Sequence, residues 1–206
     1  MNETQQKNEK TPRSFEAFLR RSFKGLIDPV AGFLLKIGFT PNSITVLGLV
    51  LSLGVAVLIG FGYITWAGIL ILISAPMDAL DGSMARLQNN STLYGAFLDS
   101  VVDRYSEMII LGGLLIYYLA NSNSIAVILV FLSAVGSIMV SYTKARAESL
   151  GFSAKVGLLT RVERILVLAP CLIFNIPIVA LWILAILGNF TALQRFFFVR
   201  QQAFHS

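Results

Sequence analysis

The sequence contains few of the residues that soluble proteins commonly use for metal binding or covalent catalysis. Its 206 residues include one cysteine, Cys171, and one histidine, His205. A single cysteine excludes an internal disulfide, and because Cys171 lies in an apolar run we expect it only to pack. With one histidine, close to the C-terminus, we expect neither a histidine-ligated zinc site nor histidine-based catalysis.

Charge is also scarce. Charged residues make up 13% of the chain and hydrophobic residues 56%, with a mean hydropathy of +0.75. A soluble domain is about a quarter charged, so the composition indicates an all-α, polytopic integral membrane protein. A span needs about 20 residues, and the shorter apolar stretches reach that length if their polar flanks continue the helix. Six transmembrane helices are therefore predicted, around residues 43–62, 64–77, 105–120, 124–140, 164–174 and 176–193.

The segment before the first span divides into two parts. Residues 1–13 are polar and lack the apolar core of a signal peptide, so we expect a disordered cytoplasmic tail. Over residues 14–36 apolar and basic residues interleave, which predicts an amphipathic helix on the inner leaflet or, equally, an extension packed on the bundle. The membrane domain would cover residues 14–200, with the six-helix bundle at 43–200 and a tail at 201–206.

Lysine and arginine are unevenly distributed over the connections between these helices. The connections near 61–64, 120–124 and 174–177 carry neither, whereas basic residues precede the first span, flank the alternate connections and end the last helix. The positive-inside rule then places both termini, and the alternate connections, in the cytoplasm. With no targeting segment in view, we expect a multi-pass protein of a prokaryotic plasma membrane.

Four of the five aspartates stand close together in these apolar surroundings: Asp78, Asp81, Asp99 and Asp103. Ionised carboxylates at membrane depth are costly and normally mark function. Each pair is spaced to share one helical face, and the polar turn between the pairs lets the two helices run antiparallel. Four converging carboxylates suit one or two Mg²⁺ or Mn²⁺ ions, and magnesium commonly binds substrate phosphates.

The neighbouring residues are compatible with a phosphate-bearing substrate. Gly82 and Ala85 lack bulk and would let a ligand approach the helix, although small residues at this spacing are equally typical of ordinary helix packing. Arg86 could bind a phosphate or serve as a counter-ion for the carboxylates.

The run Asp78-Ala-Leu-Asp81-Gly82-Ser-Met-Ala85-Arg86, followed by Gly95, Asp99 and Asp103, resembles the signature of the CDP-alcohol phosphotransferases. This resemblance implies a six-helix membrane enzyme, expected to be a homodimer. Asp78, Asp81 and Asp99 would hold the divalent cations on the CDP diphosphate. Asp103 would be the general base and a further metal ligand. An acceptor hydroxyl would attack the phosphorus that bears the lipid and expel CMP.

The acceptor would be recognised by a basic segment at 141–164. Helix ends at the cytoplasmic surface attract lysine and arginine in any case, but Lys144, Arg146 and Arg161 could converge near the metal site and bind an anionic acceptor. The segments 142–148, 161–164 and 38–45, together with Gln194-Arg195, resemble bacterial phosphatidylinositol-phosphate synthases, whose donor is CDP-diacylglycerol and whose acceptor is inositol 1-phosphate.

That likeness implies two sets of binding residues. Lys144, Arg146, Arg161 and Arg195 would bind the inositol phosphate. The nucleotide pocket would be lined by Asn42, Thr45, Gly82, Ala85 and Arg86. The family often has an aspartate where Asn42 stands, and the nucleotide contact at that position is therefore open.

Several alternatives remain open at this point. The same chemistry could use glycerol 3-phosphate, inositol or serine as acceptor, or an ether-lipid CDP donor. Intramembrane carboxylates also occur in cation transporters, and a scaffold or inactive relative would keep the fold alone. No nucleic-acid partner is expected.

Overall fold

The computed structural model describes residues 15–88, 92–154 and 156–205, with side chains described from residue 25 to residue 204. The described residues form eight α-helices and no strand. The helices are α1 (Phe15–Lys36), α2 (Pro41–Gly60), α3 (Ile64–Ser74), α4 (Met77–Leu87), α5 (Leu93–Ala120), α6 (Ser124–Ser149), α7 (Arg161–Ile173) and α8 (Pro177–His205).

Side chains at the first turn set the starts of several helices. Thr40 and Ser43 form a capping box at the start of α2, where Pro41 needs no hydrogen-bond partner for its nitrogen. The Thr92 side chain accepts a hydrogen bond from the Gly95 nitrogen at the start of α5. Asn123 caps α6 in the same way. Each cap satisfies an amide that the helix itself leaves unpaired.

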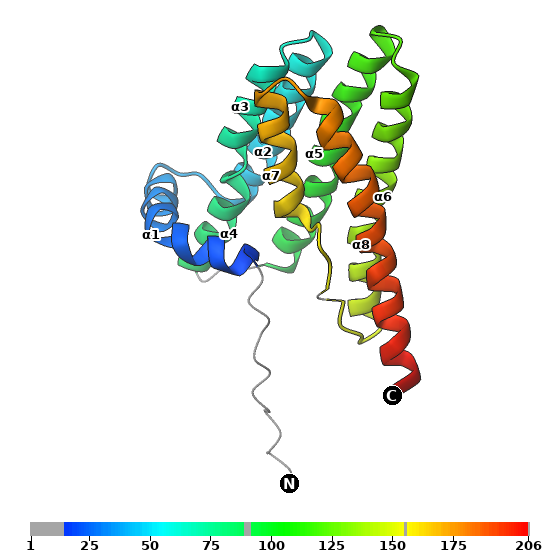
Figure 1. The fold of residues 1–206 in the computed structure, drawn as a ribbon. Helices are drawn as coiled ribbons and strands as arrows, with labels where there is room; N and C mark the ends of the chain where they lie inside the picture. Colours follow the sequence, from blue (N-terminus) through cyan, green and yellow to red (C-terminus); the bar gives the residue numbers. More distant parts are fainter. Residues whose placement is uncertain (1–14, 89–91, 155, 206) are drawn as a thin grey trace.

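The helices are arranged so that the connections alternate between two ends of the bundle (Figure 1). The α2–α3, α5–α6 and α7–α8 connections lie at the upper end in this view. The α6–α7 connection, helix α1 and the C-terminal end of α8 lie at the lower end, as do α4 and the start of α5. The connections that lack lysine and arginine therefore share one end of the molecule.

Two predicted spans extend beyond their apolar stretches, as expected. The second, at 64–77, continues to Leu87, but it is interrupted at Ala75 and Pro76 and so consists of two helices, α3 and α4, because proline has no N–H to continue the backbone ladder. The polar flank of the third, at 105–120, extends the helix back to Leu93. The expected tail at 201–206 is helical as far as His205, since nothing in it breaks a helix and Gln202 is held by the main chain of Ser153.

The predicted membrane spans are confirmed in part. Four helical segments are long and apolar enough to cross a membrane, Pro41–Gly60, Ile64–Leu87, Ser124–Ser149 and Pro177–Phe204, so the protein is membrane-embedded and all-helical. Helix α5 carries four charged residues near its start, and α7 has 13 residues, which explains why neither counts among these segments. The predicted tail at 1–13 lies outside the described residues.

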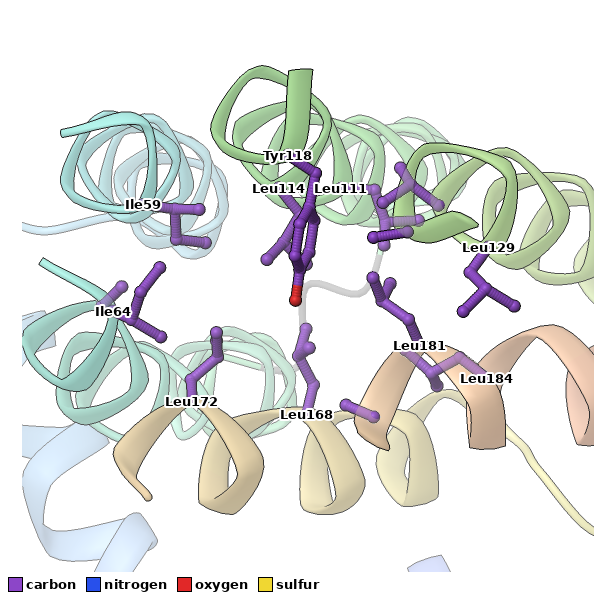
Figure 2. Close-up of a cluster of buried hydrophobic side chains, with 14 of the residues drawn as sticks. Ile59, Ile64, Leu111, Leu114, Tyr118, Leu129, Leu168, Leu172, Leu181 and Leu184 are labelled. Carbon is purple, nitrogen blue, oxygen red and sulfur yellow. The ribbon is translucent and has the colours of Figure 1, made fainter. Parts of the chain in front are cut away.

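The main core lies between α2, α3, α5, α6, α7 and α8. Figure 2 shows Ile59, Ile64, Leu114, Leu172 and Leu181 directed into the space between their helices. The helices approach closely where one of them has a glycine. A Cβ on Gly68 would lie 2.7 Å from the backbone of Ile173, and a Cβ on Gly113 would lie 2.7 Å from that of Ala56. Close backbone contact through small residues is typical of membrane helices.

A second, smaller cluster packs α1 against α2 and α4. It consists of Ala31, Ile44, Leu80 and Met84, with Ile27 and Leu34 at its edge. Leu80 and Met84 lie on the same helix as the first two aspartates. Burial of this apolar face therefore holds α4 in place and sets the direction in which its carboxylates point.

Candidate active site

The four aspartates come from two helices, as predicted. Asp78 and Asp81 lie in the first turns of α4, and Asp99 and Asp103 in the first half of α5. Asp78 and Asp99 both lie within electrostatic range of Asp81 and of Asp103. The carboxylates differ in accessibility, because Asp81 is 6% exposed whereas the Asp78 side chain is 38% exposed.

Arg161 connects the two helices of the acidic site. Its Nη2 lies 2.7 Å from Asp78 Oδ2, and its Nη1 lies 2.5 Å from Asp103 Oδ2. Arg161 is the first residue of α7, so a third helix contributes directly to the site. One positive charge thus stands between two carboxylates that would otherwise repel each other.

Asp81 has a different partner. Thr45, on the second turn of α2, donates its hydroxyl hydrogen to Asp81 Oδ2 at 2.6 Å. Both residues are buried, at 7% and 6% exposure. Because a carboxylate buried beside apolar helices needs a donor, Thr45 fixes the orientation of Asp81, a contact the sequence did not predict.

The other residues assigned to the nucleotide pocket come from two helices, with Asn42 at the start of α2 and the rest on α4. A Cβ on Gly95 would lie 3.4 Å from the Asn42 amide oxygen and 3.1 Å from Thr92 Oγ1, so glycine permits this contact between the two helix starts. Gly82 and Ala85 are partly buried on α4. Arg86 is exposed and donates a 2.6 Å hydrogen bond to the Ser83 hydroxyl.

The basic residues assigned to the acceptor do not form one cluster. Lys144 and Arg146 are exposed on the last turns of α6. Arg195, on α8, is 5% exposed and donates to two main-chain carbonyls, with Nε 2.8 Å from Val156 O and Nη1 2.5 Å from Val140 O. Its contacts join α8 to α6 and to the α6–α7 connection, whereas Arg161 contacts the aspartates.

Sequence reasoning missed a second ion pair one turn deeper. Arg164 Nε lies 2.6 Å from Glu107 Oε1 and Arg164 Nη2 lies 2.9 Å from Glu107 Oε2, a bidentate pair. Ser137 on α6 donates to the same carboxylate at 2.7 Å. The spacing in the sequence could have indicated this pair. Glu107 follows Asp103 by four residues and Arg164 follows Arg161 by three, so each lies on the same helical face as the active-site residue before it.

A cavity of about 70 Å³ connects the two ion pairs. It is lined by α2, α3, α4, α5, α7 and α8, and it has the polar side chains of Asp78, Asp103, Glu107, Arg161 and Arg164 on its wall, together with Thr45. This volume exceeds the space that one water molecule requires. Asp78 and Asp103, two of the four aspartates, therefore line a hollow within the bundle.

A family model for CDP-alcohol phosphatidyltransferase matches residues 39–198. The chain belongs to this family. It is thus a phosphatidyltransferase enzyme, and the match covers every aspartate and arginine of the site just described. Family membership also removes the cation-transporter hypothesis as an account of the four carboxylates.

Two relatives are named phosphatidylinositol phosphate synthase. The protein from Mycobacteroides abscessus is 34% identical over 190 residues, covering 88% of this chain and 86% of the relative. The protein from Corynebacterium glutamicum is 37% identical over 187 residues, covering 85% and 84%. An archaetidylinositol phosphate synthase from Pyrococcus horikoshii is 33% identical over 178 residues, covering 86% and 92%.

Solved structures of the Mycobacterium tuberculosis phosphatidylinositol phosphate synthase are similar to this chain. The structure with CDP-DAG bound has a TM-score of 0.78 at 31% identity, covering 84% of this chain and 92% of the other. The structure in complex with manganese and citrate has the same score and identity and covers 84% and 88%.

The acidic site of this phosphatidyltransferase has the donor chemistry of a divalent-metal centre. Carboxylate oxygens are the ligands that Mg²⁺ and Mn²⁺ prefer, and one guanidinium already bridges Asp78 and Asp103. Among the side chains that the structure describes, no three acidic, histidine or cysteine residues lie close enough together to hold an ion. The donor set fits a hard cation, and the complete ligand set remains a prediction.

Proposed function

We propose that this phosphatidyltransferase transfers the phosphatidyl group of CDP-diacylglycerol to inositol 1-phosphate. The products would be CMP and phosphatidylinositol phosphate. The observation that carries the proposal is the position of Arg161, a residue of the basic segment, directly against two of the four signature aspartates. A cationic group suited to an acceptor phosphate therefore stands beside the proposed general base. The names of the two bacterial relatives support the same acceptor.

In the proposed reaction, Asp103 accepts the proton of an inositol hydroxyl. The oxygen of that hydroxyl forms a bond to the phosphorus that bears the diacylglycerol. The bond between this phosphorus and the bridging oxygen of the diphosphate breaks, and CMP leaves with that oxygen. Asp103 is suited to this role because its side chain is 16% exposed, so that it can meet an acceptor, and because its carboxylate lies 2.5 Å from the Arg161 guanidinium.

Arg161 is proposed to bind the acceptor phosphate with its remaining donors. A guanidinium has five N–H groups, and the two contacts of Arg161 with the aspartates leave the other N–H groups for a second anion. Lys144 and Arg146, exposed on α6, would approach the same phosphate from the side of the α6–α7 connection. Arg195 is proposed to bind the same phosphate, and its contact with Val156 would hold that connection in place.

Asp78, Asp81, Asp99 and Asp103 are proposed to hold one or two Mg²⁺ or Mn²⁺ ions, which would neutralise charge on the diphosphate and on departing CMP. Thr45 would orient Asp81 for this task. The nucleotide itself would lie between α2, which carries Asn42 and Thr45, and α4, which carries Gly82, Ala85 and Arg86.

We further propose six membrane spans, adding α5 and α7 to the four apolar segments. Helix α5, with 28 residues, is about 42 Å long and reaches across a bilayer. In a plasma membrane, the end of the bundle with α1, the α6–α7 connection and the C-terminus would face the cytoplasm. Helix α1 would lie on the cytoplasmic surface of the membrane as an amphipathic helix. The active protein would be a homodimer.

The competing reaction keeps the chemistry and changes a substrate. The similarity to an archaetidylinositol phosphate synthase favours an ether-lipid donor as the second candidate. Lipid-facing side chains are apolar with either tail, so the two donors must be compared directly.

The decisive experiment measures CMP release by purified protein in detergent with Mg²⁺ or Mn²⁺. Donors with ester-linked and ether-linked tails are each combined with inositol 1-phosphate, inositol, glycerol 3-phosphate or serine. We expect turnover with CDP-diacylglycerol and inositol 1-phosphate. Turnover with another acceptor alone would refute the assignment of Lys144, Arg146 and Arg161 to an inositol phosphate. Absence of CMP release from every pair would refute the proposed reaction.

A further inference from the structure

The pair formed by Glu107 and Arg164 lies next to the active site but is separate from its signature residues. Arg164 is 4% exposed, and its guanidinium makes both bonds of a fork to the Glu107 carboxylate. Its third nitrogen, Nη1, lies 3.3 Å from the Leu159 carbonyl oxygen, just before α7 begins. Ser137 on α6 completes the set. Three helices and a connection therefore meet at one charge pair.

A buried ion pair of this kind is not explained by stability. Removing two charges from water costs about as much as their attraction returns, and well-packed apolar side chains often replace such a pair without loss. The pair does, however, fix geometry. A bidentate contact between Arg164 and Glu107 is made only when α7 has one rotation and one height relative to α5.

The second contact between the same two helices is the active-site pair of Arg161 and Asp103. Arg161 and Arg164 lie three residues apart on one face of α7, and Asp103 and Glu107 lie four residues apart on one face of α5. Two arginines on one helix thus meet two carboxylates on the other. Of the two arginines, Arg164 is the buried one, at 4% exposure, whereas Arg161 is 31% exposed.

We propose that Glu107 and Arg164 are positioning residues for acceptor binding. Their pair sets the start of α7 against α5 and so holds Arg161 at the place where it meets both Asp103 and the acceptor phosphate. Neither residue touches substrate. The inference rests on the proposed function, in which Arg161 binds the acceptor.

The test uses variants that separate geometry from stability. Arg164→Met alone leaves a buried carboxylate without its cation and is expected to lower the unfolding temperature. The double variant Glu107→Leu with Arg164→Met removes both charges, and its unfolding temperature is expected to return toward that of the wild type. In both variants the KM for the acceptor is expected to rise about tenfold to a hundredfold. The reason is that loss of the pair would displace Arg161, and misplacement of a binding group by about 1 Å can reduce the efficiency of an enzyme by about that factor. The KM for the CDP-lipid should stay within about twofold of the wild-type value.

Ser133→Ala is the matched control. Ser133 is buried on α6 and donates to the Leu181 carbonyl oxygen at 3.3 Å, in the core and away from the aspartates. This variant is expected to lower stability while leaving both KM values unchanged. A double variant with restored stability and a wild-type KM for the acceptor would overturn the inference. So would an equal rise in both KM values.

The acceptor in this comparison is whichever one the wild-type protein turns over. If that acceptor is not inositol 1-phosphate, the proposed function fails while the ratio of KM values still tests the positioning role. If no acceptor supports turnover by the wild-type protein, both proposals fail together.

Discussion

The hydrogen bond between Thr45 and Asp81 allows a direct test of how this protein holds a carboxylate inside a helical bundle. Replacing Thr45 by valine removes the hydroxyl and keeps the shape of the side chain. Asp81 then loses the donor that lies 2.6 Å from its Oδ2, and both positions are at least nine-tenths buried, so water replaces that donor poorly.

The expected cost follows from the charge of the acceptor. Hydrogen bonds between neutral groups in a membrane protein average about 0.6 kcal/mol, whereas bonds to a charged group contribute about 1.5–3 kcal/mol. Burial of Asp81 places this bond in the upper range. For a chain of this size, each kcal/mol lost from the free energy of unfolding lowers the unfolding temperature by about 2–4 °C. Thr45→Val should therefore lower the unfolding temperature by about 3–12 °C.

The assay is thermal unfolding of purified protein in detergent without added metal, together with CMP release as a function of Mn²⁺ concentration. Thr45→Ser is the matched control, because it keeps the hydroxyl and loses one methyl group. Since Asp81 would bind the metal with its orientation set by Thr45, we expect the half-saturating Mn²⁺ concentration to rise about tenfold to a hundredfold in the valine variant. The serine variant should remain near the wild type. Valine and serine variants with equal unfolding temperatures and equal Mn²⁺ responses would refute the reasoning.

Three further predictions concern the base, its neighbour and the α6–α7 connection. Asp103→Asn should abolish CMP release while largely sparing binding of Mn²⁺ and CDP-lipid, measured by titration calorimetry. CMP release near the wild-type rate would contradict the role of Asp103 as base. Asp78→Asn should weaken the response to Mn²⁺ at least tenfold, and an unchanged titration of CMP release would exclude it as a ligand. Gly157→Ala should lower the unfolding temperature more than Gly151→Ala, because both have positive φ but a Cβ on Gly157 alone would meet Thr191 Cγ2, at 2.6 Å. Equal losses of unfolding temperature in the two variants would show that backbone strain, and not the contact with α8, causes the destabilisation.

The sequence predicts much of the helical architecture because the bilayer restricts the choice. Apolar stretches in a membrane must satisfy their own backbone hydrogen bonds, and in this chain they do so as helices. The ends of these helices were less predictable. Pro76 divides the second predicted span, and α8 continues to His205 through residues whose polarity suggested a tail. Polar composition indicates exposure to water, but it does not end a helix that has caps and contacts.

Arg195 illustrates the limit for individual side chains. Its likeness to a family position predicts that it binds the acceptor phosphate, and that role stays a prediction. The sequence did not predict that its guanidinium is buried and holds the Val140 and Val156 carbonyls. An arginine has five donors, and the carbonyls they meet depend on which chain segments fold beside it, here the α6–α7 connection.

The sequence by itself determined that this chain is a helical membrane protein with a carboxylate site and a basic segment, because hydropathy and residue spacing act locally along the chain. The spacing of Asp78 and Asp81, or of Asp99 and Asp103, places each pair on one face of a helix. Only the tertiary structure decided which partner each carboxylate has. Thr45 for Asp81, Arg161 for Asp78 and Asp103, and Arg164 for Glu107 come from other helices. Helical periodicity fixes a face, but the rotation and height of one helix against another depend on packing across the whole bundle.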